Sequence, residues 1–175
     1  MLKEGYDNFV DSIINPLKLF KRKLDVRDSI YYVLILNIII FVLMSIYQYI
    51  FTGFTFGKAI ITIFLFALGL VVLILMIYVS SLVFYLVTKN LFKVKSKLND
   101  MFNLFAYCLT PLILANLFTP FSLYVIPVFI IWNLVLLMYG ISAKFKVSKI
   151  KALIISVVSY LIIFVVIGII ANLFI

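Results

Sequence analysis

Long uncharged apolar runs divide this chain of 175 residues, and the gaps between the runs are alternately rich and poor in basic residues. The basic gaps are residues 1–29, 89–100 and 144–151, which hold fourteen of the fifteen Lys and Arg residues. The remaining one, Lys58, lies in the gap near 52–58. Lys and Arg in short loops are retained on the cytoplasmic side of a membrane. The alternation therefore predicts five crossings, with the N-terminus in the cytoplasm and the C-terminus outside.

The apolar runs predict an all-α fold: a polytopic membrane protein with a bundle of five transmembrane helices and an amphipathic N-terminal interfacial helix. About 20 apolar residues cross the roughly 30 Å hydrocarbon core of a bilayer. The run over 101–143 is long enough for two spans, which we expect to be joined by a turn around Thr119–Ser122. An arm at 1–29 precedes a transmembrane domain at 30–175, with spans at about 30–51, 59–88, 101–118, 123–143 and 152–175.

Composition supports a membrane protein and limits its chemistry. The chain is 67% apolar with a mean hydropathy of +1.32, whereas soluble domains are about 45–50% apolar. There is no His and only one Cys, Cys108, which excludes an intrachain disulfide and zinc sites built from His and Cys. We expect no cofactor and no metal. The Ile-, Phe- and Lys-rich composition without His hints at an AT-rich prokaryotic genome, and hence at the cell membrane of a prokaryote.

The net charge of +9 is explained by orientation, so we expect no nucleic-acid partner. Fourteen basic and all six acidic residues fall in the three basic gaps, which leaves +8 on the predicted cytoplasmic face. Such a face attracts the anionic headgroups of membrane lipids, and an acidic protein partner is the other ligand that it suits. The six carboxylates are expected to be helix caps and solvated charges.

The N-terminal arm has a helical pattern. Its apolar residues recur at spacings of three and four, which places them on one face: Phe9, Ile13, Leu17, Phe20 and Leu24. Asn15-Pro16 is expected to divide this helix, with Asn15 as the cap and Pro16 at the first helical position after it. The pattern predicts a helix in the headgroup plane; the alternative is a solvated arm with chance periodicity. The candidate residues for binding lipid or a partner are Lys18, Lys21, Arg22 and Lys23 of the arm, with Lys93, Lys95 and Lys97 of the second basic gap.

The predicted spans contain no Asp, Glu, Lys, Arg or His, so they offer no general base and no metal ligands. We therefore do not expect an enzyme. Polar residues of the third span form a candidate seam: Asn103, Tyr107, Thr110, Pro111 and Asn116. Pro111 frees the carbonyl of Tyr107, which Thr110, Asn103 or a neighbouring helix would then have to satisfy. The seam serves either to pack helices together or to line a pocket for a neutral or lipid-like ligand.

The residues of the third span also resemble a known family. The element Phe102-x-x-Phe105-Ala106-Tyr107-x-x-x-Pro111-x-x-Leu114, after a basic loop, resembles the Yip-domain family of Ypt-interacting membrane proteins. Further similarities are Trp132, Tyr139-Gly140, Ser148-Lys149-x-Lys151-Ala152 and Ile13-Ile14-Asn15-Pro16-Leu17-x-x-Phe20. The resemblance implies five clustered spans and a cytosolic N-terminus. In eukaryotic members it implies roles in Golgi and endoplasmic-reticulum trafficking, in membrane shape and with Rab-type GTPases, which a prokaryote would lack.

The function that we expect is that of a non-enzymatic, Yip-type membrane protein, a membrane-organising or trafficking-like adaptor or scaffold. One alternative is a transporter or channel for a neutral or lipid-like substrate, which would use the polar seam. Another is an accessory subunit of a larger membrane complex.

Overall fold

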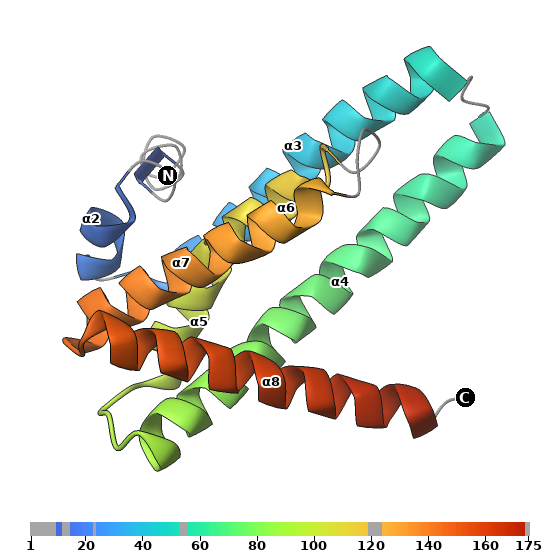
Figure 1. The fold of residues 1–175 in the computed structure, drawn as a ribbon. Coiled ribbons are helices and arrows are strands. Elements are labelled where there is room, and N and C mark those ends of the chain that lie inside the picture. The colour runs from blue at the N-terminus through green and yellow to red at the C-terminus, as the bar shows by residue number, and fades with distance from the viewer. Residues whose placement is uncertain (1–9, 12–14, 23, 53–55, 119–123, 174–175) are drawn as a thin grey trace.

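The structure is a computed structural model and describes residues 10–11, 15–22, 24–52, 56–118 and 124–173. Within these residues the ordered elements are helices, without a strand (Figure 1). They form five segments that are long and apolar enough to cross a membrane, and the third of these segments consists of two shorter helices. The all-α fold is thus confirmed. The helices are α2 at Pro16–Lys21, α3 at Val26–Thr52, α4 at Phe56–Leu86, α5 at Leu98–Cys108, α6 at Thr110–Ala115, α7 at Val125–Phe145 and α8 at Lys149–Leu173. A π-helical turn, Val87–Leu91, extends α4.

The predicted third span is the centre of the molecule. Every residue from Met101 to Cys108 is buried, because α3, α4 and α7 all contact α5. About 67% of the α5–α6 span is buried, whereas only 6% of the most apolar stretch of α4 is buried. This span is also the least apolar of the five. The bundle therefore places its most polar span inside and its most apolar span outside, the order that an apolar solvent favours.

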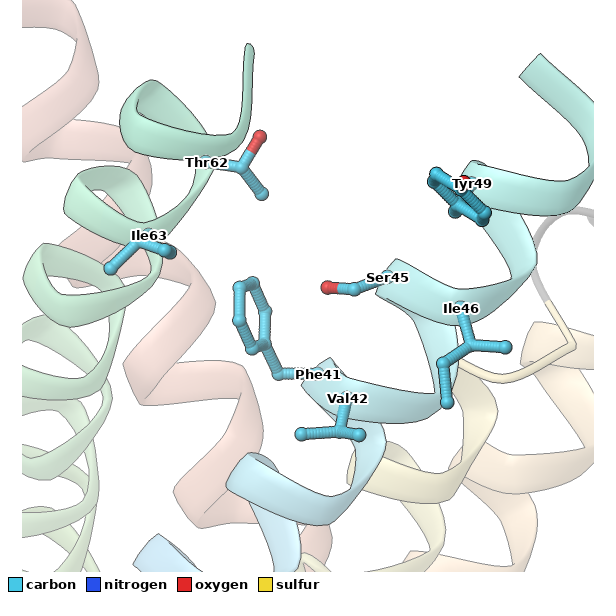
Figure 2. Close-up of a pocket in the computed structure, with 7 residues that line it drawn as sticks. All are labelled: Phe41, Val42, Ser45, Ile46, Tyr49, Thr62 and Ile63. Atoms are coloured by element: carbon cyan, nitrogen blue, oxygen red, sulfur yellow. The ribbon is translucent and has the colours of Figure 1, made fainter. Parts of the chain in front are cut away.

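Helix α4 has a packed half and an exposed half. Ile77, Ser81 and Phe84 are buried in its C-terminal half, where the Phe84 ring lies 5.3 Å from the Phe105 ring and 5.6 Å from the Tyr160 ring. The N-terminal half contains no buried residue between 60 and 76. It meets α3 at a stacked pair of rings, Phe41 and Phe66, whose centroids are 4.0 Å apart. Beyond this pair the two long helices frame an open groove (Figure 2).

The short helix α2 packs against α7 instead of standing apart from the bundle. Asn15 is its N-cap and Pro16 its first residue, as predicted. Leu19 and Phe20 are 0% and 1% exposed. The apolar stripe was expected to contact the bilayer. Phe20 instead packs inside the protein, against α7. Of the other stripe residues, Phe9 and Ile13 lie outside the described residues, as does the predicted turn at Thr119–Ser122.

A glycine on α7 explains why Phe20 fits there. A Cβ atom at Gly140 would lie 3.2 Å from the ring of Phe20 and 3.1 Å from Leu104, closer than nearly all real Cβ contacts. Gly140 thus lets α2, α5 and α7 approach one another closely. After α7, Lys146 adopts a left-handed conformation with φ of 54°, which ends the helix and lets α8 fold back beside α7.

Candidate functional site

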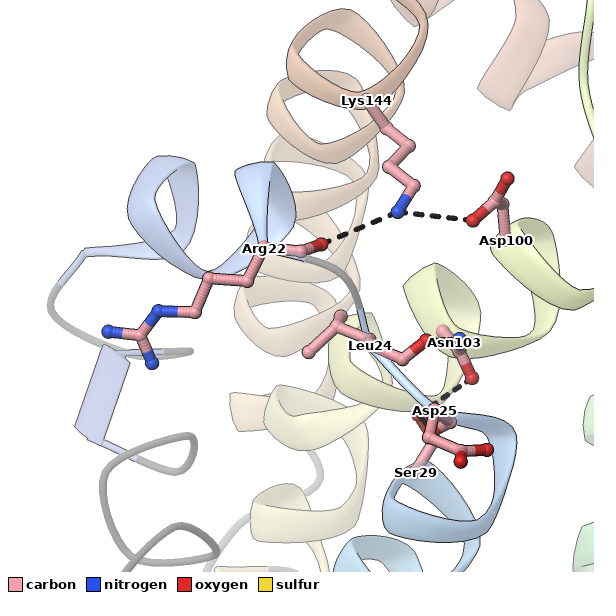
Figure 3. Close-up of polar contacts among 7 residues, drawn as sticks. All are labelled: Arg22, Leu24, Asp25, Ser29, Asp100, Asn103 and Lys144. Carbon is pink, nitrogen blue, oxygen red and sulfur yellow. Dashed lines mark hydrogen bonds and ion pairs between the residues drawn. The ribbon is translucent and has the colours of Figure 1, made fainter.

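The three basic segments meet at one end of the molecule, where a lysine of α7 joins α5 to the arm. Lys144 Nζ lies 3.1 Å from Asp100 Oδ1 and 3.5 Å from the carbonyl oxygen of Arg22 (Figure 3). Lys144 is 18% exposed at its side chain and Asp100 31%, so this ion pair is half-shielded from solvent. The segments 1–29, 89–100 and 144–151 are thus linked by direct contacts, and their charge is concentrated on one face.

A second link at the same end is made by Asn103, the first residue of the predicted polar seam. Its Nδ2 donates to the carbonyl oxygen of Leu24 at 2.8 Å, and its Oδ1 accepts from Ser29 Oγ at 2.9 Å. Ser29 Oγ also lies 3.1 Å from the carbonyl oxygen of Asp25 (Figure 3). Asn103 therefore fixes the chain where it enters α3. The spacing of Ser29 in the sequence does not reveal this partner, because Ser29 and Asn103 are 74 positions apart.

The arm carries its own ion pairs. Arg22 Nη2 lies 2.8 Å from Asp11 Oδ2, and Lys18 Nζ lies 3.5 Å from Asp11 Oδ1. Asp11 is only 9% exposed, so the expectation that all six carboxylates are caps or solvated charges is wrong for this residue. Arg22 and Lys18 are partly neutralised, which reduces the charge that they offer to a ligand.

The remaining candidate lysines face outward. Lys21, Lys93, Lys95 and Lys97 are all exposed, whereas Lys23 lies outside the described residues. Lys93 has a φ of 54°, and the following backbone amide, of Val94, donates to the carbonyl oxygen of Thr88 at 3.0 Å. This tight turn after the π-helical segment carries the second basic gap back towards α5.

The middle of the predicted seam is buried and internally bonded. Thr110 Oγ1 donates to the carbonyl oxygen of Tyr107 at 2.6 Å, so Thr110 is the residue that satisfies the group freed by Pro111. Tyr32 Oη lies 2.6 Å from Thr110 Oγ1, and the rings of Tyr32 and Tyr107 have centroids 4.5 Å apart. Because the Thr110 proton points to Tyr107, Tyr32 acts as the donor to Thr110.

A second buried contact lies at the same helix break, and the sequence did not identify its partners. Asn133 Nδ2 of α7 donates to the carbonyl oxygen of Cys108 at 2.6 Å, and the Tyr160 hydroxyl of α8 donates to Asn133 Oδ1. An asparagine in the middle of an apolar run was the available signal, because such a side chain needs a partner in lipid. The pair ties α5, α7 and α8 together where α5 gives way to α6.

The five seam residues do not form one surface. Asn103 serves the entry to α3, Tyr107 and Thr110 bond to each other and to Tyr32, Pro111 is buried, and Asn116 is exposed beyond the end of α6. The bonds of Asn103 and Thr110 join the third span to the arm and to α3.

These features define a class: a multi-pass integral membrane protein whose polar side chains serve helix packing and whose basic segments share one end. A family model for the Yip1 domain matches residues 10–170. The chain therefore belongs to the Yip1 domain family, which confirms the resemblance found in the third span and its neighbours. Neither a curated protein nor a solved structure gives a significant match to this chain.

Proposed function

We propose that this protein is a non-enzymatic adaptor or scaffold of the membrane whose basic end binds anionic lipid headgroups and recruits acidic partners. The observation that supports this most directly is the meeting of the three basic segments at one end. Membership of the Yip1 domain family supports a membrane role of this kind. The retention of Lys and Arg on the cytoplasmic side supports a cytoplasmic position for the basic end. The Ile-, Phe- and Lys-rich composition without His supports the cell membrane of a prokaryote.

The packing of the arm indicates how this end would meet a membrane surface. Leu19 and Phe20 are occupied by contacts inside the protein, while Lys18 and Lys21 on the same short helix are exposed. Binding would therefore be electrostatic, through lysines that reach headgroups, without insertion of Leu19 or Phe20. Each Lys or Arg near an anionic surface contributes about 1 kcal/mol, and salt weakens this attraction.

The test replaces the lysines of the 89–100 segment in the full-length protein. We expect Lys93→Gln, Lys95→Gln and Lys97→Gln, combined, to reduce the preference for phosphatidylglycerol over phosphatidylcholine at low salt. The reduction should be at least about fivefold, the equivalent of one lysine. Spin-labelled lipids in proteoliposomes measure this preference. The matched control changes the same three residues to Arg, which keeps the charge and should keep the preference. An unchanged preference in the Gln variant would refute headgroup binding by this segment.

The adaptor role has a separate test. We expect purification in a mild detergent to retain a protein partner in stoichiometric amount, and the Lys-to-Gln variant to lose it while the Lys-to-Arg variant keeps it. Retention of the partner by both variants would instead assign its binding to the helices, as in an accessory subunit. A chain that purifies without a partner would contradict the adaptor role.

A further inference from the structure

The ends of three helices meet at one side chain of the basic end, that of Lys144. This residue belongs to the last turn of α7, and its Nζ lies 3.1 Å from Asp100 Oδ1 and 3.5 Å from the carbonyl oxygen of Arg22 (Figure 3). Asp100 lies in the first turn of α5, and Arg22 is the C-cap residue of α2. A single ammonium group therefore joins three elements that are far apart in the sequence.

The positive charge of Lys144 suits each of these helix ends. The last carbonyl groups of a helix lack partners within the helix and carry partial negative charge, so a cation is stabilised in the last turn of α7 and beside the carbonyl of Arg22. The carboxylate of Asp100 is stabilised by the free N–H groups in the first turn of α5. Because the Lys144 side chain is only 18% exposed, water screens these attractions less than it screens those of a surface pair.

Lys144 also helps to fix the direction of the chain that leaves α2. It holds the carbonyl of Arg22, and Asn103 Nδ2 holds the carbonyl of Leu24, two residues further on, at 2.8 Å. Contacts at both carbonyls leave α2 little freedom to swing away from α7. The exposed lysines of α2 are thereby kept at the end of the molecule that also carries the exposed lysines of the second basic gap.

We propose that Lys144 is a positioning residue for headgroup binding and is not itself a headgroup ligand. Its ammonium group is occupied by Asp100 and by the carbonyl of Arg22. It acts through Lys18 and Lys21, which it keeps in place on the docked arm. Headgroups that meet a docked arm do not have to order it, which favours binding. This inference rests on the proposed headgroup binding and identifies the residue that organises it.

The experiment uses a charge-neutral variant of the full-length protein, which combines Lys144→Met with Asp100→Asn. It loses one positive and one negative charge, so the net charge stays at +9, and no carboxylate is left without its partner. We expect trypsin to cleave this variant after Lys18 or Lys21 at least about fivefold faster, because the bond from a charged group to the arm is lost. The preference for phosphatidylglycerol over phosphatidylcholine, measured with spin-labelled lipids in proteoliposomes at low salt, should fall although the net charge is unchanged.

The dependence of one effect on the other distinguishes a positioning residue from one more headgroup ligand. In the unmodified protein, Lys18→Gln combined with Lys21→Gln should lower the preference for phosphatidylglycerol at least about fivefold. In the charge-neutral variant the same two substitutions should lower it much less, because the released lysines are no longer held in place. Equal reductions in the two backgrounds would overturn the proposal, since residues that act independently have additive effects on the free energy of binding.

Two further variants serve as controls. Lys144→Arg keeps the charge and should keep both the slow cleavage and the lipid preference. Lys146→Met removes an exposed lysine of the same basic segment and should leave the cleavage of the arm unchanged. The melting temperature of each variant reports on folding. If the charge-neutral variant does not fold, Asp100→Asn alone should still accelerate cleavage, by a smaller factor, because Lys144 keeps its contact with Arg22.

The two measurements separate this proposal from the proposed function. An unmodified protein without a preference for phosphatidylglycerol would contradict headgroup binding, and the cleavage rates would still show whether Lys144 holds the arm. Cleavage of the charge-neutral variant at the rate of the unmodified protein would overturn the positioning role, whatever the lipid preference.

Discussion

At the scale of single residues, the helix break in the third span shows how a neighbouring side chain accommodates a proline. Pro111 removes one backbone donor, and the side chain of Thr110 replaces it at the carbonyl of Tyr107. The sequence left Thr110, Asn103 or a neighbouring helix as candidates for this bond, and the structure assigns it to Thr110. The sequence did not identify Tyr32 as the next donor, since a contact across 78 positions depends on how helices face one another.

The bonds at this break predict an order of effects. Thr110→Val removes both the donor to Tyr107 and the acceptor from Tyr32, whereas Tyr32→Phe keeps the bond from Thr110 to Tyr107. We expect Thr110→Val to destabilise the protein by about 1–2 kcal/mol and Tyr32→Phe by about 0.6 kcal/mol, the average for such bonds in a bilayer. Thr110→Ser, the matched control, should retain most of the stability. Unfolding in mixed detergent measures these values, and a larger loss for Tyr32→Phe would contradict the direction of the bonds.

At the scale of elements, the sequence predicted where helices lie better than what each helix touches. Apolar runs of sufficient length predicted the five long helices, since the length of a span is set by the bilayer. The site residues were harder to place. Lys18, Lys21, Lys93, Lys95 and Lys97 are exposed as their positions outside the apolar runs suggested, but the pairing of Arg22 with Asp11 and of Lys144 with Asp100 required the packed structure.

The contact between α2 and α7 depends on the missing side chain at Gly140. We expect Gly140→Leu to displace Phe20 and release the arm, because overpacking of a filled site costs about 1–3 kcal/mol. Trypsin should then cleave after Lys18 or Lys21 at least about fivefold faster, because a cost of about 1 kcal/mol corresponds to a roughly fivefold larger population of the released arm.

Gly168→Leu is the control, because a Cβ atom at Gly168 meets no atom within 4 Å. Equal cleavage of the Gly140→Leu variant and the unmodified protein would show that Phe20 is not held by this contact.

At the scale of the whole molecule, alternation of charge along the chain corresponds to the two ends of a bundle. The sequence predicts that the basic end lies in the cytoplasm. The structure adds what a one-dimensional pattern lacks: α5 is central, α4 is peripheral, and α3 and α4 frame an open groove. These features depend on which helices pack against one another. Apolar runs of similar composition do not indicate their packing partners.

Two exposed positions allow the orientation to be measured. Ile150, at the start of α8, is 74% exposed and belongs to the basic end, and Tyr124, just before α7, is 91% exposed and lies at the other end. In a Cys108→Ala background, we expect a membrane-impermeant maleimide to label Tyr124→Cys in intact cells. Ile150→Cys should be labelled only after the membrane is opened. The reverse pattern would show that the basic end faces outward.

The central position of α5 also has a consequence for how the protein is made. A span enters the membrane from the translocon more readily the more apolar it is, and the α5–α6 segment is the least apolar of the five. Its neighbours α3 and α4 are synthesised first and offer it buried contacts, whereas α7 follows later. During biogenesis α3 and α4 therefore have to remain close to the growing chain until α5 is inserted between them. The centre of the bundle is then completed after two of its outer helices.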